Sequence, residues 1–341
     1  MLTFLIPRTE FALRVTPMPK HALTITDKFI YSTIKGLLNL PQRASREIVA
    51  ISPHLGGGGY IPLPMQKDIL VLAHAFRMLT CRDAYVREKS WASLREVVHR
   101  KIGRMSPLPS KSLICRYLTG CTDGDLATTT AAVSTVWSRT RKATRDLFVA
   151  INPRWEWSDA RQELSLRFAH PSQRVDEIIV PASARHRVLA LLRRAAVEGL
   201  RRKLCAKLDQ GKAYDALTAS RESSHFMRSG KYTRFCDWRF IHRARLNLLP
   251  LNAARKGAVT SRRCRVCRDE DETLPHVVNH CLRHSGAWIR RQDEILALAT
   301  NMEGGDEQTG GGRPLPPPAG SRDHGGSGGS NSRGGCDCSL R

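Results

Sequence analysis

The sequence lacks any apolar run as long as the ~18 residues that a membrane-spanning helix needs. Its opening segment, MLTFLIPRTE, also lacks the basic region with which a secretory signal peptide begins. Acidic residues are scarce, because 31 Asp and Glu stand against 55 Lys and Arg, for a formal net charge of +24. These shortages disfavour a membrane protein and a secreted enzyme. The surplus of positive charge indicates a polyanionic partner, with nucleic acid ahead of an anionic membrane surface.

The rest of the composition is that of a folded protein. Of the 341 residues, 41% are hydrophobic and 25% are charged, which is ordinary for globular domains, and the length is typical of two domains. The exception is residues 297–341, which are rich in glycine, contain PLPPP at Pro314–Pro318 and have almost nothing apolar to bury. We expect this Gly/Pro-rich tail to be disordered.

Hydrophobic periodicity predicts a mainly α protein that begins with a small helical bundle over residues 1–105. Thr24 and Asp27 have the spacing of a capping box before a first helix, and Pro62 and Pro64 lead into a second. A third is expected over 86–100. The apolar positions of these helices are Phe29, Ile30, Ile34, Leu37 and Leu38, then Ile69, Leu72, Ala73, Phe76 and Leu79, then Trp91, Leu94 and Val98. The Gly56–Gly59 run lacks the Gly-Lys-Ser/Thr ending of a phosphate-binding loop, so it is interpreted as a turn.

Residues 106–182 are predicted to be an irregular or helical connector. Two prolines interrupt MSPLPSKS, the stretch 127–149 has the pattern of one or two helices, and Trp155 and Trp157 are expected to anchor a loop or short strand on a core.

Residues 183–263 are predicted to be a basic helical linker. Its first part can place Val188, Leu191, Leu192, Ala195, Leu200 and Leu204 on one helix face. Only Glu198 and Asp209 interrupt the cations of this segment. Two interpretations of these cations therefore remain, a contact with a polyanion and a solvated helix face.

Residues 225–263 carry the densest mixture of arginine and aromatic residues. Guanidinium groups pair with phosphates, and aromatic rings stack on unpaired bases. The aromatic residues are Phe226, Tyr232, Phe235, Trp238 and Phe240. A place in the core is the favoured interpretation for Trp238, Ile241, Leu246 and Leu249, because their spacing suits a buried helix face.

Residues 264–296 are predicted to be a zinc knuckle followed by a helix. Cys264, Cys267, His276 and Cys281 form a C-x2-C-x8-H-x4-C pattern, and thiolates and imidazole are the ligands of structural zinc. On a regular helix His280 shares the face of His276 better than Cys281 does, so His280 is the alternative fourth ligand; the softness of a thiolate favours Cys281. Four protein ligands leave no position for a catalytic water, and no H-x-E motif accompanies them, which argues against deaminase chemistry.

Three blocks of the sequence resemble the C-terminal part of the polyproteins of non-LTR retrotransposons, of the kind that inserts into ribosomal RNA genes. They are DQGKAYDAL at 209–217, SHFMRSGKYTRFCDWRFIHRARLNLLPLNA at 224–253, and the cysteine–histidine cluster with ETLPHVVNHC at 272–281. Residues 19–80 are similar to the helical thumb that follows the polymerase palm of this family. The resemblance implies a nuclear fragment of an RNA-directed DNA polymerase and endonuclease that acts in target-primed reverse transcription.

The same resemblance exposes two missing catalytic motifs. Reverse transcriptases hold two metal ions with an Asp-Asp pair, and the family's endonuclease has a Pro-Asp motif followed by an acid-x-Lys. The sequence contains neither Asp-Asp nor Pro-Asp. We therefore expect no catalytic residue in this chain, structural Zn²⁺ as its cofactor, and Mg²⁺ only in the missing catalytic domains.

The expected partner is element RNA, target DNA or both, with no membrane and no small-molecule substrate. Predicted phosphate contacts are Arg228, Lys231, Arg234, Arg239, Arg243, Arg245, Arg255, Lys256, Arg262 and Arg263. Ion pairing with Asp237 or Glu272 is the alternative role for some of these cations. The alternative functions are a stand-alone zinc-containing nucleic-acid-binding protein without catalysis, or the product of a decayed element without function.

Overall fold

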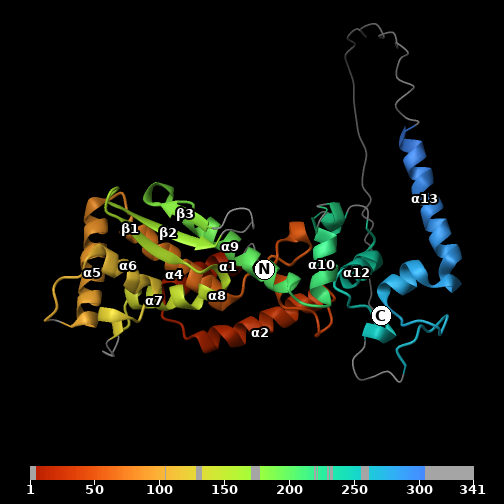
Figure 1. Ribbon diagram of the computed structural model, residues 1–341, viewed down its shortest axis with the longest axis horizontal. Coiled ribbons are helices and arrows are strands. Elements are labelled where there is room, and N and C mark those ends of the chain that lie inside the picture. The colour runs from red at the N-terminus through yellow and green to blue at the C-terminus, as the bar shows by residue number, and fades with distance from the viewer. Residues whose placement is uncertain are drawn as a thin grey trace, which may run out of the picture. The chain divides into compact units, whose positions relative to one another are not determined.

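The computed structural model describes residues 5–103, 105–127, 133–169, 177–218, 220, 222–228, 230, 233–254 and 261–303. It is mainly helical, as predicted, and it also contains one small sheet that was not predicted (Figure 1). The chain divides into two compact units, Met1–Cys281 and Leu282–Arg341. We expected residues 297–341 to be disordered. Residues 304–341 lie outside the described residues, whereas residues 297–303 belong to a helix that ends at Glu303, so the expectation is wrong for those seven residues.

The N-terminal half contains eight of the α-helices found in the described residues. Their bounds are α1 Leu5–Val15, α2 Lys20–Leu37, α3 Glu47–Ala50, α4 Leu63–Leu79, α5 Ala84–Ile102, α6 Lys111–Thr119, α7 Val136–Asp146 and α8 Phe148–Ile151. Single 3-10 turns are η1 Pro53–Leu55 and η2 Gly124–Ala127.

An antiparallel three-stranded sheet follows, in the order β1-β2-β3, formed by β1 Arg154–Ser158, β2 Glu163–Ala169 and β3 Glu177–Pro181. Trp155 of β1 pairs with Leu166 of β2, which pairs with Val180 of β3, and all three are buried. Alternate residues therefore turn one face of the sheet toward the core.

The remaining helices belong to the C-terminal half of the chain. They are α9 Val188–Cys205, α10 Gln210–Thr218, α11 His225–Arg228, α12 Phe235–Ala244 and α13 Ser285–Glu303, with short turns η3 Ala182–Ala184, η4 Glu222–Ser224, η5 Asn252–Ala254, η6 His276–His280 and η7 Leu282–His284. Of these, α13 and η7 lie in the second unit.

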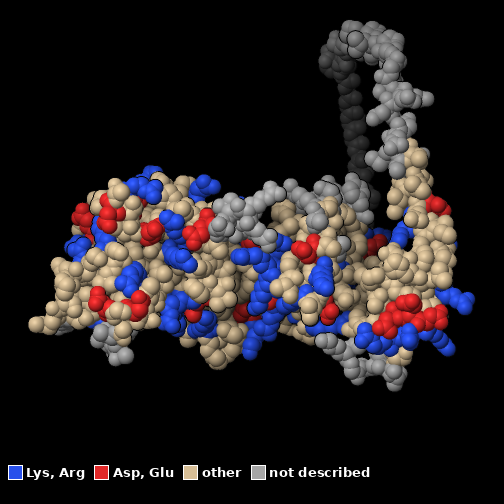
Figure 2. All heavy atoms as spheres, in the orientation of Figure 1, with Lys and Arg blue, Asp and Glu red and all other residues tan. Residues whose placement is uncertain are grey.

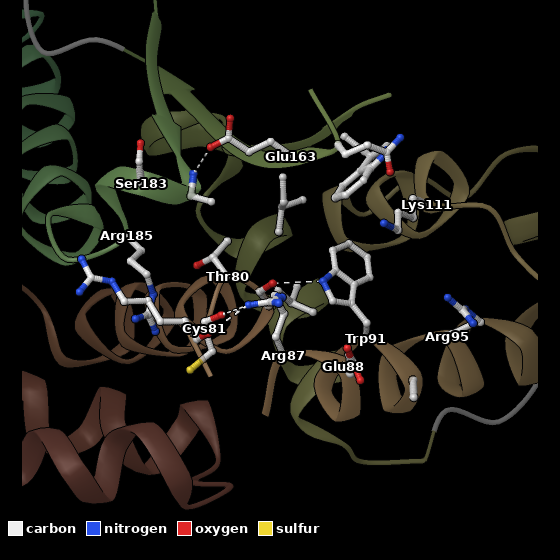
Figure 3. A pocket seen from close by; sticks show the side chains of 17 residues that line it. Thr80, Cys81, Arg87, Glu88, Trp91, Arg95, Lys111, Glu163, Ser183 and Arg185 are labelled. Carbon is white, nitrogen blue, oxygen red and sulfur yellow. Dashed lines mark hydrogen bonds between the residues drawn. The ribbon is translucent and has the colours of Figure 1, made fainter. Parts of the chain in front are cut away.

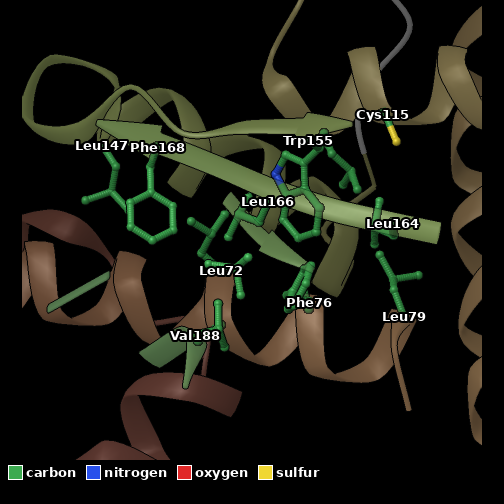
Figure 4. Packing of buried hydrophobic residues seen from close by; sticks show 14 of the residues in the cluster. Leu72, Phe76, Leu79, Cys115, Leu147, Trp155, Leu164, Leu166, Phe168 and Val188 are labelled. Atoms are coloured by element: carbon green, nitrogen blue, oxygen red, sulfur yellow. The ribbon is translucent and has the colours of Figure 1, made fainter. Parts of the chain in front are cut away.

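The largest apolar core is built around α4, whose predicted stripe is buried in full. Leu72, Phe76 and Leu79 pack with Trp155, Leu164, Leu166 and Phe168 of the sheet and with Val188 of α9 (Figure 4). This core extends from Ile69 to Ala196, so it crosses the domain boundaries predicted at 105 and 182. The segment 106–182 is part of a folded core because its strands and α7 cover α4 directly.

A second core joins the N-terminal helices to the predicted basic linker. Leu23 and Tyr31 of α2 share it with Leu204, Tyr214 and Leu246. The first predicted helix has a different start and face, because α2 begins at Lys20, and Phe29 and Leu37 are 74% and 72% exposed. Asp27 does not close a capping box for it: its carboxylate accepts hydrogen bonds from the Tyr60 hydroxyl and the Leu63 N–H, at the start of α4.

The glycine run forms the turn that the sequence predicts. Gly56 has a φ of 79°, in the left-handed region that glycine tolerates best. A Cβ on Gly57 would lie 2.1 Å from the carbonyl oxygen of Ile51, so the close approach of two backbones requires glycine there. Among the described residues, no helix is both long and apolar enough to cross a bilayer.

Candidate metal centre and basic aromatic surface

The loop that carries Cys264 and Cys267 is held by a short antiparallel bridge between Arg263 and Asp271. Within it, the N–H of Arg268 donates to the carbonyl oxygen of Cys264 at 3.0 Å. Arg268 has a φ of 66°, a left-handed conformation that closes the turn tightly. Two cysteines separated by two residues on such a turn can direct both thiols to one ion.

The structure brings together the four predicted metal ligands. The ligand atoms of Cys264, Cys267, His276 and Cys281 all lie within 4.8 Å of one another, and all four residues except Cys267 are buried. The Cys267 sulfur is 3.3 Å from Nε2 of His276. Three thiols and one imidazole at these separations are a donor set that fits tetrahedral zinc, which is the chemistry that the sequence pattern predicts.

The environment of Cys267 favours the thiolate, the form that binds metal. Hydrogen bonds from the backbone N–H groups of Glu270 and Asp269 lower the pKa of this thiol to about 6. Backbone donors directed at a sulfur stabilise its negative charge.

A π-helical turn determines which residue completes the set. Residues His276–His280 form this turn, and the N–H of Cys281 donates to the carbonyl oxygen of His276 at 2.7 Å, a bond that spans five residues. The wider turn places Cys281, and not His280, beside His276: Cys281 is buried in the cluster, whereas His280 is exposed. This geometry favours Cys281 as the fourth ligand. Thr273 caps the start of this turn, since its hydroxyl accepts from the His276 N–H at 3.2 Å.

Glu272 anchors the metal-site loop to the preceding segment. This buried carboxylate accepts hydrogen bonds from Nε of Arg265 at 2.7 Å and from the N–H of Asn252 at 2.7 Å. Burial by itself raises the pKa of Glu272, but these hydrogen bonds outweigh it and hold the pKa below its usual range. Arg265 also donates to the Pro250 carbonyl, and Arg43 donates to the carbonyl oxygens of Leu249 and Ala254. These hydrogen bonds of Glu272, Arg265 and Arg43 therefore attach the metal-site loop to the rest of the fold.

Helix α12 carries an exposed surface of aromatic rings and arginine. Phe235 and Phe240 are 63% and 53% exposed. Phe235 stacks on Trp238 with ring centroids 6.1 Å apart and an interplanar angle of 12°, and the Arg239 guanidinium lies 4.2 Å from the Phe235 centroid. We call Phe235, Arg239 and Phe240 the α12 surface. Trp238 is only half-buried, while Leu246 and Leu249 are buried, as expected for core residues.

The predicted phosphate contacts divide into several groups. Lys231, Arg255 and Lys256 lie outside the described residues, as does the side chain of Arg228. Arg234 and Arg262 are exposed but paired with Asp237 at 2.7 Å and Asp271 at 3.2 Å. The Arg263 guanidinium donates to the Asp269 carbonyl oxygen. Arg239 has no hydrogen bond or ion pair within the described part of the chain.

Two of these arginines are used inside the fold. Arg243 donates from Nε to the carbonyl oxygen of Asn39 at 2.8 Å and from Nη2 to its side-chain oxygen at 2.9 Å. Arg245 is 5% exposed, and its guanidinium donates to the Ser223 carbonyl and the Ser224 hydroxyl. The guanidinium of Arg245 therefore serves contacts within the fold and is not exposed to a phosphate in this structure.

The cations near and along α9 show a similar division. Lys203 and Lys207 pair with Glu47 at 3.4 and 2.6 Å, and Arg201 pairs with Glu198 at 2.9 Å. Glu47 is distant in the sequence, which is why the basic run appeared unopposed there. Acidic side chains lie among basic ones over the face of the molecule drawn in Figure 2.

Comparisons with protein-family models, with curated proteins and with solved structures found no match to this chain.

Proposed function

We propose that this chain is a nucleic-acid-binding protein with a structural zinc centre, and that it is the non-catalytic, C-terminal part of a retroelement reverse transcriptase and endonuclease. Within such a protein, residues 1–105 serve as the thumb against the template–primer duplex. The metal centre and α12 hold element RNA or target DNA. The retroelement assignment rests on the sequence resemblance, and the binding role rests on charge and surface chemistry.

The observation that carries the binding role is the α12 surface on a chain with a net charge of +24. Single-stranded bases stack on exposed aromatic rings without regard to sequence. Arg239 lies over the ring of Phe235 with no acidic partner within the described residues. It is placed to meet the phosphate of a base stacked nearby.

The metal centre contributes stability to this arrangement. All four ligands come from the protein, so an ion bound there has no open position for a substrate or an activated water. Zinc would hold the 264–281 loop in one conformation, and the hydrogen bonds of Glu272 with Asn252 and of Arg265 with Pro250 would transmit that order to the preceding segment.

The test is binding of a fluorescent single-stranded oligonucleotide to the Phe235→Ala/Phe240→Ala variant. Because stacking contributes about 1–3 kcal/mol per base, we expect the dissociation constant to rise at least tenfold. The matched control is Phe148→Ala, which removes a phenylalanine that is 58% exposed on α8, outside both α12 and the segment assigned to the thumb. Unchanged affinity in the first variant, or an equal loss in both, would contradict a binding role for the α12 surface.

A further inference from the structure

A cavity of about 730 Å³ opens between α4, α5, α6 and the sheet, far along the sequence from the metal centre. Its wall includes Thr80 and Cys81 from the end of α4, Trp91 and Arg95 from α5, and Lys111 from the start of α6 (Figure 3). The volume lies in the range of pockets that hold small ligands. The sequence pattern did not indicate this cavity, because its walls come from segments more than a hundred residues apart, from Leu79 to Arg185.

Two tryptophans form the aromatic part of the wall. The rings of Trp91 and Trp157 meet edge to face with centroids 5.6 Å apart. Trp91 is fixed by its indole N–H, which donates to the carbonyl oxygen of Leu79 at 3.1 Å. The Lys111 ammonium lies 3.7 Å from the Trp157 centroid, so a cation is held at the same wall. An aromatic surface is thus adjacent to a fixed positive charge.

The lining is positively charged overall. Five cations line the cavity, namely Arg82, Arg87, Arg95, Lys111 and Arg185, against the acids Glu88 and Glu163. Several are already engaged: Arg87 donates to the Cys81 carbonyl at 2.6 Å, Arg185 to the Arg77 carbonyl at 2.7 Å, and Glu163 accepts from the Ala182 N–H at 2.8 Å.

The side chains of Arg82, Arg95 and Lys111 are the cations left for a ligand. Within the described residues Arg95 has no hydrogen bond or ion pair, and Lys111 contacts only the tryptophan rings. In Figure 3 both lie on the same side of the Trp91 indole. Burial, and then the charge of Arg95, lower the pKa of Lys111, and the nearby Asp159 offsets this only in part.

We propose that this cavity binds a nucleoside monophosphate unit, with its base against Trp91 and its phosphate between Arg95 and Lys111. Tryptophan faces and edges bind planar heteroaromatic rings, and the two cations bind the phosphate by charge-assisted hydrogen bonds. The unit is supplied either by a free nucleotide or by an unpaired residue at the end of a strand. This departs from the expectation that the chain takes no small-molecule ligand.

A phosphotyrosine side chain offers a similar combination of ring and phosphate. The nucleotide is favoured because the purine or pyrimidine, the sugar and the phosphate together fill more of a cavity of about 730 Å³ than a single phenyl phosphate does. Inorganic phosphate, adenosine and phosphotyrosine therefore serve as the comparison ligands.

The test is calorimetric titration of the full chain with 5′-AMP and with a 5′-phosphorylated trinucleotide. We expect saturable binding of 5′-AMP that is tighter than that of adenosine, inorganic phosphate or phosphotyrosine. Tighter binding of the trinucleotide would identify a strand end as the source, and equal binding a free nucleotide. No saturable binding by either nucleotide ligand, or stronger binding of phosphotyrosine, would overturn the proposal.

Variants locate the site. Arg95→Ala/Lys111→Ala should weaken 5′-AMP binding at least tenfold, whereas Lys89→Ala/Arg100→Ala, which removes two cations of α5 that do not line the cavity, should leave it unchanged. If the first variant does not fold, Arg95→Ala alone serves, because no interaction within the described residues depends on it. Equal effects of both double variants would overturn the proposal.

The Phe235→Ala/Phe240→Ala variant separates this proposal from the proposed function. It should keep 5′-AMP binding, so a failure of the cavity proposal can be distinguished from a failure of the binding role of the α12 surface.

Discussion

His242 shows how one buried side chain makes stability depend on pH. It lies on the inner face of α12, 1% exposed, with its ring centroid 5.2 Å from that of Trp238 and with Nε2 unpartnered. Burial lowers the pKa of His242 to about 4. A proton added below the ordinary pKa of ~6.5 therefore binds the unfolded chain and not the folded one.

We expect His242 to remove stability as the pH falls from about 6.5 to about 4, at up to about 1.4 kcal/mol per pH unit. The free energy of unfolding of the wild-type chain should thus fall by about 1–2 kcal/mol more between pH 7 and pH 5 than that of the His242→Phe variant. Urea unfolding at both pH values measures the difference. His54→Phe, at an exposed histidine, is the control and should keep the wild-type dependence. Identical pH profiles for wild type and His242→Phe would contradict this account.

The residue types of the metal centre could be predicted from sequence, because ligand spacing is local. The use made of individual arginines could not, because it depends on partners far away. Arg243 reaches Asn39, and Lys207 reaches Glu47, across more than 150 residues. The sequence shows how many cations a segment carries, but only the folded structure shows which of them are exposed to solvent.

Among the elements, the π-turn at His276–His280 shows where periodicity misleads. A regular helix favours His280 as the partner of His276, while the wider turn delivers Cys281. Helix α4 was predictable because its buried face repeats at helical spacing. Of the strands, only β1 was anticipated, as one of two alternatives at Trp155 and Trp157. Strands β2 and β3 were not, since five to seven residues give a weak signal and their partners are set by the core.

Zinc content tests the π-turn directly. Cys281→Ser should abolish stoichiometric zinc binding, because a buried ligand is lost, while His280→Ala should retain one zinc ion per chain. Elemental analysis of the purified variants after dialysis measures both. Retention of zinc by Cys281→Ser together with its loss from His280→Ala would show that the fourth ligand is His280.

At the scale of the whole molecule, the excess of cations survives the internal ion pairs. The formal net charge of +24 already subtracts every acidic residue, so pairs such as Arg201 with Glu198 redistribute the charge without cancelling the excess. The α12 surface and the cavity lined by Trp91 both belong to a chain with a large positive net charge. A polyanion that binds such a chain displaces counter-ions, and its affinity must depend on salt.

The salt dependence of nucleic-acid binding tests the central claim most directly. Fluorescence anisotropy of a labelled single-stranded oligonucleotide, titrated with the zinc-loaded chain between about 50 and 200 mM KCl, gives the association constant at each salt concentration. We predict a linear fall of its logarithm against the logarithm of salt concentration, with a slope of several units and little dependence on sequence. The absence of binding at the lowest salt concentration, or an affinity that does not change with salt, would contradict the account.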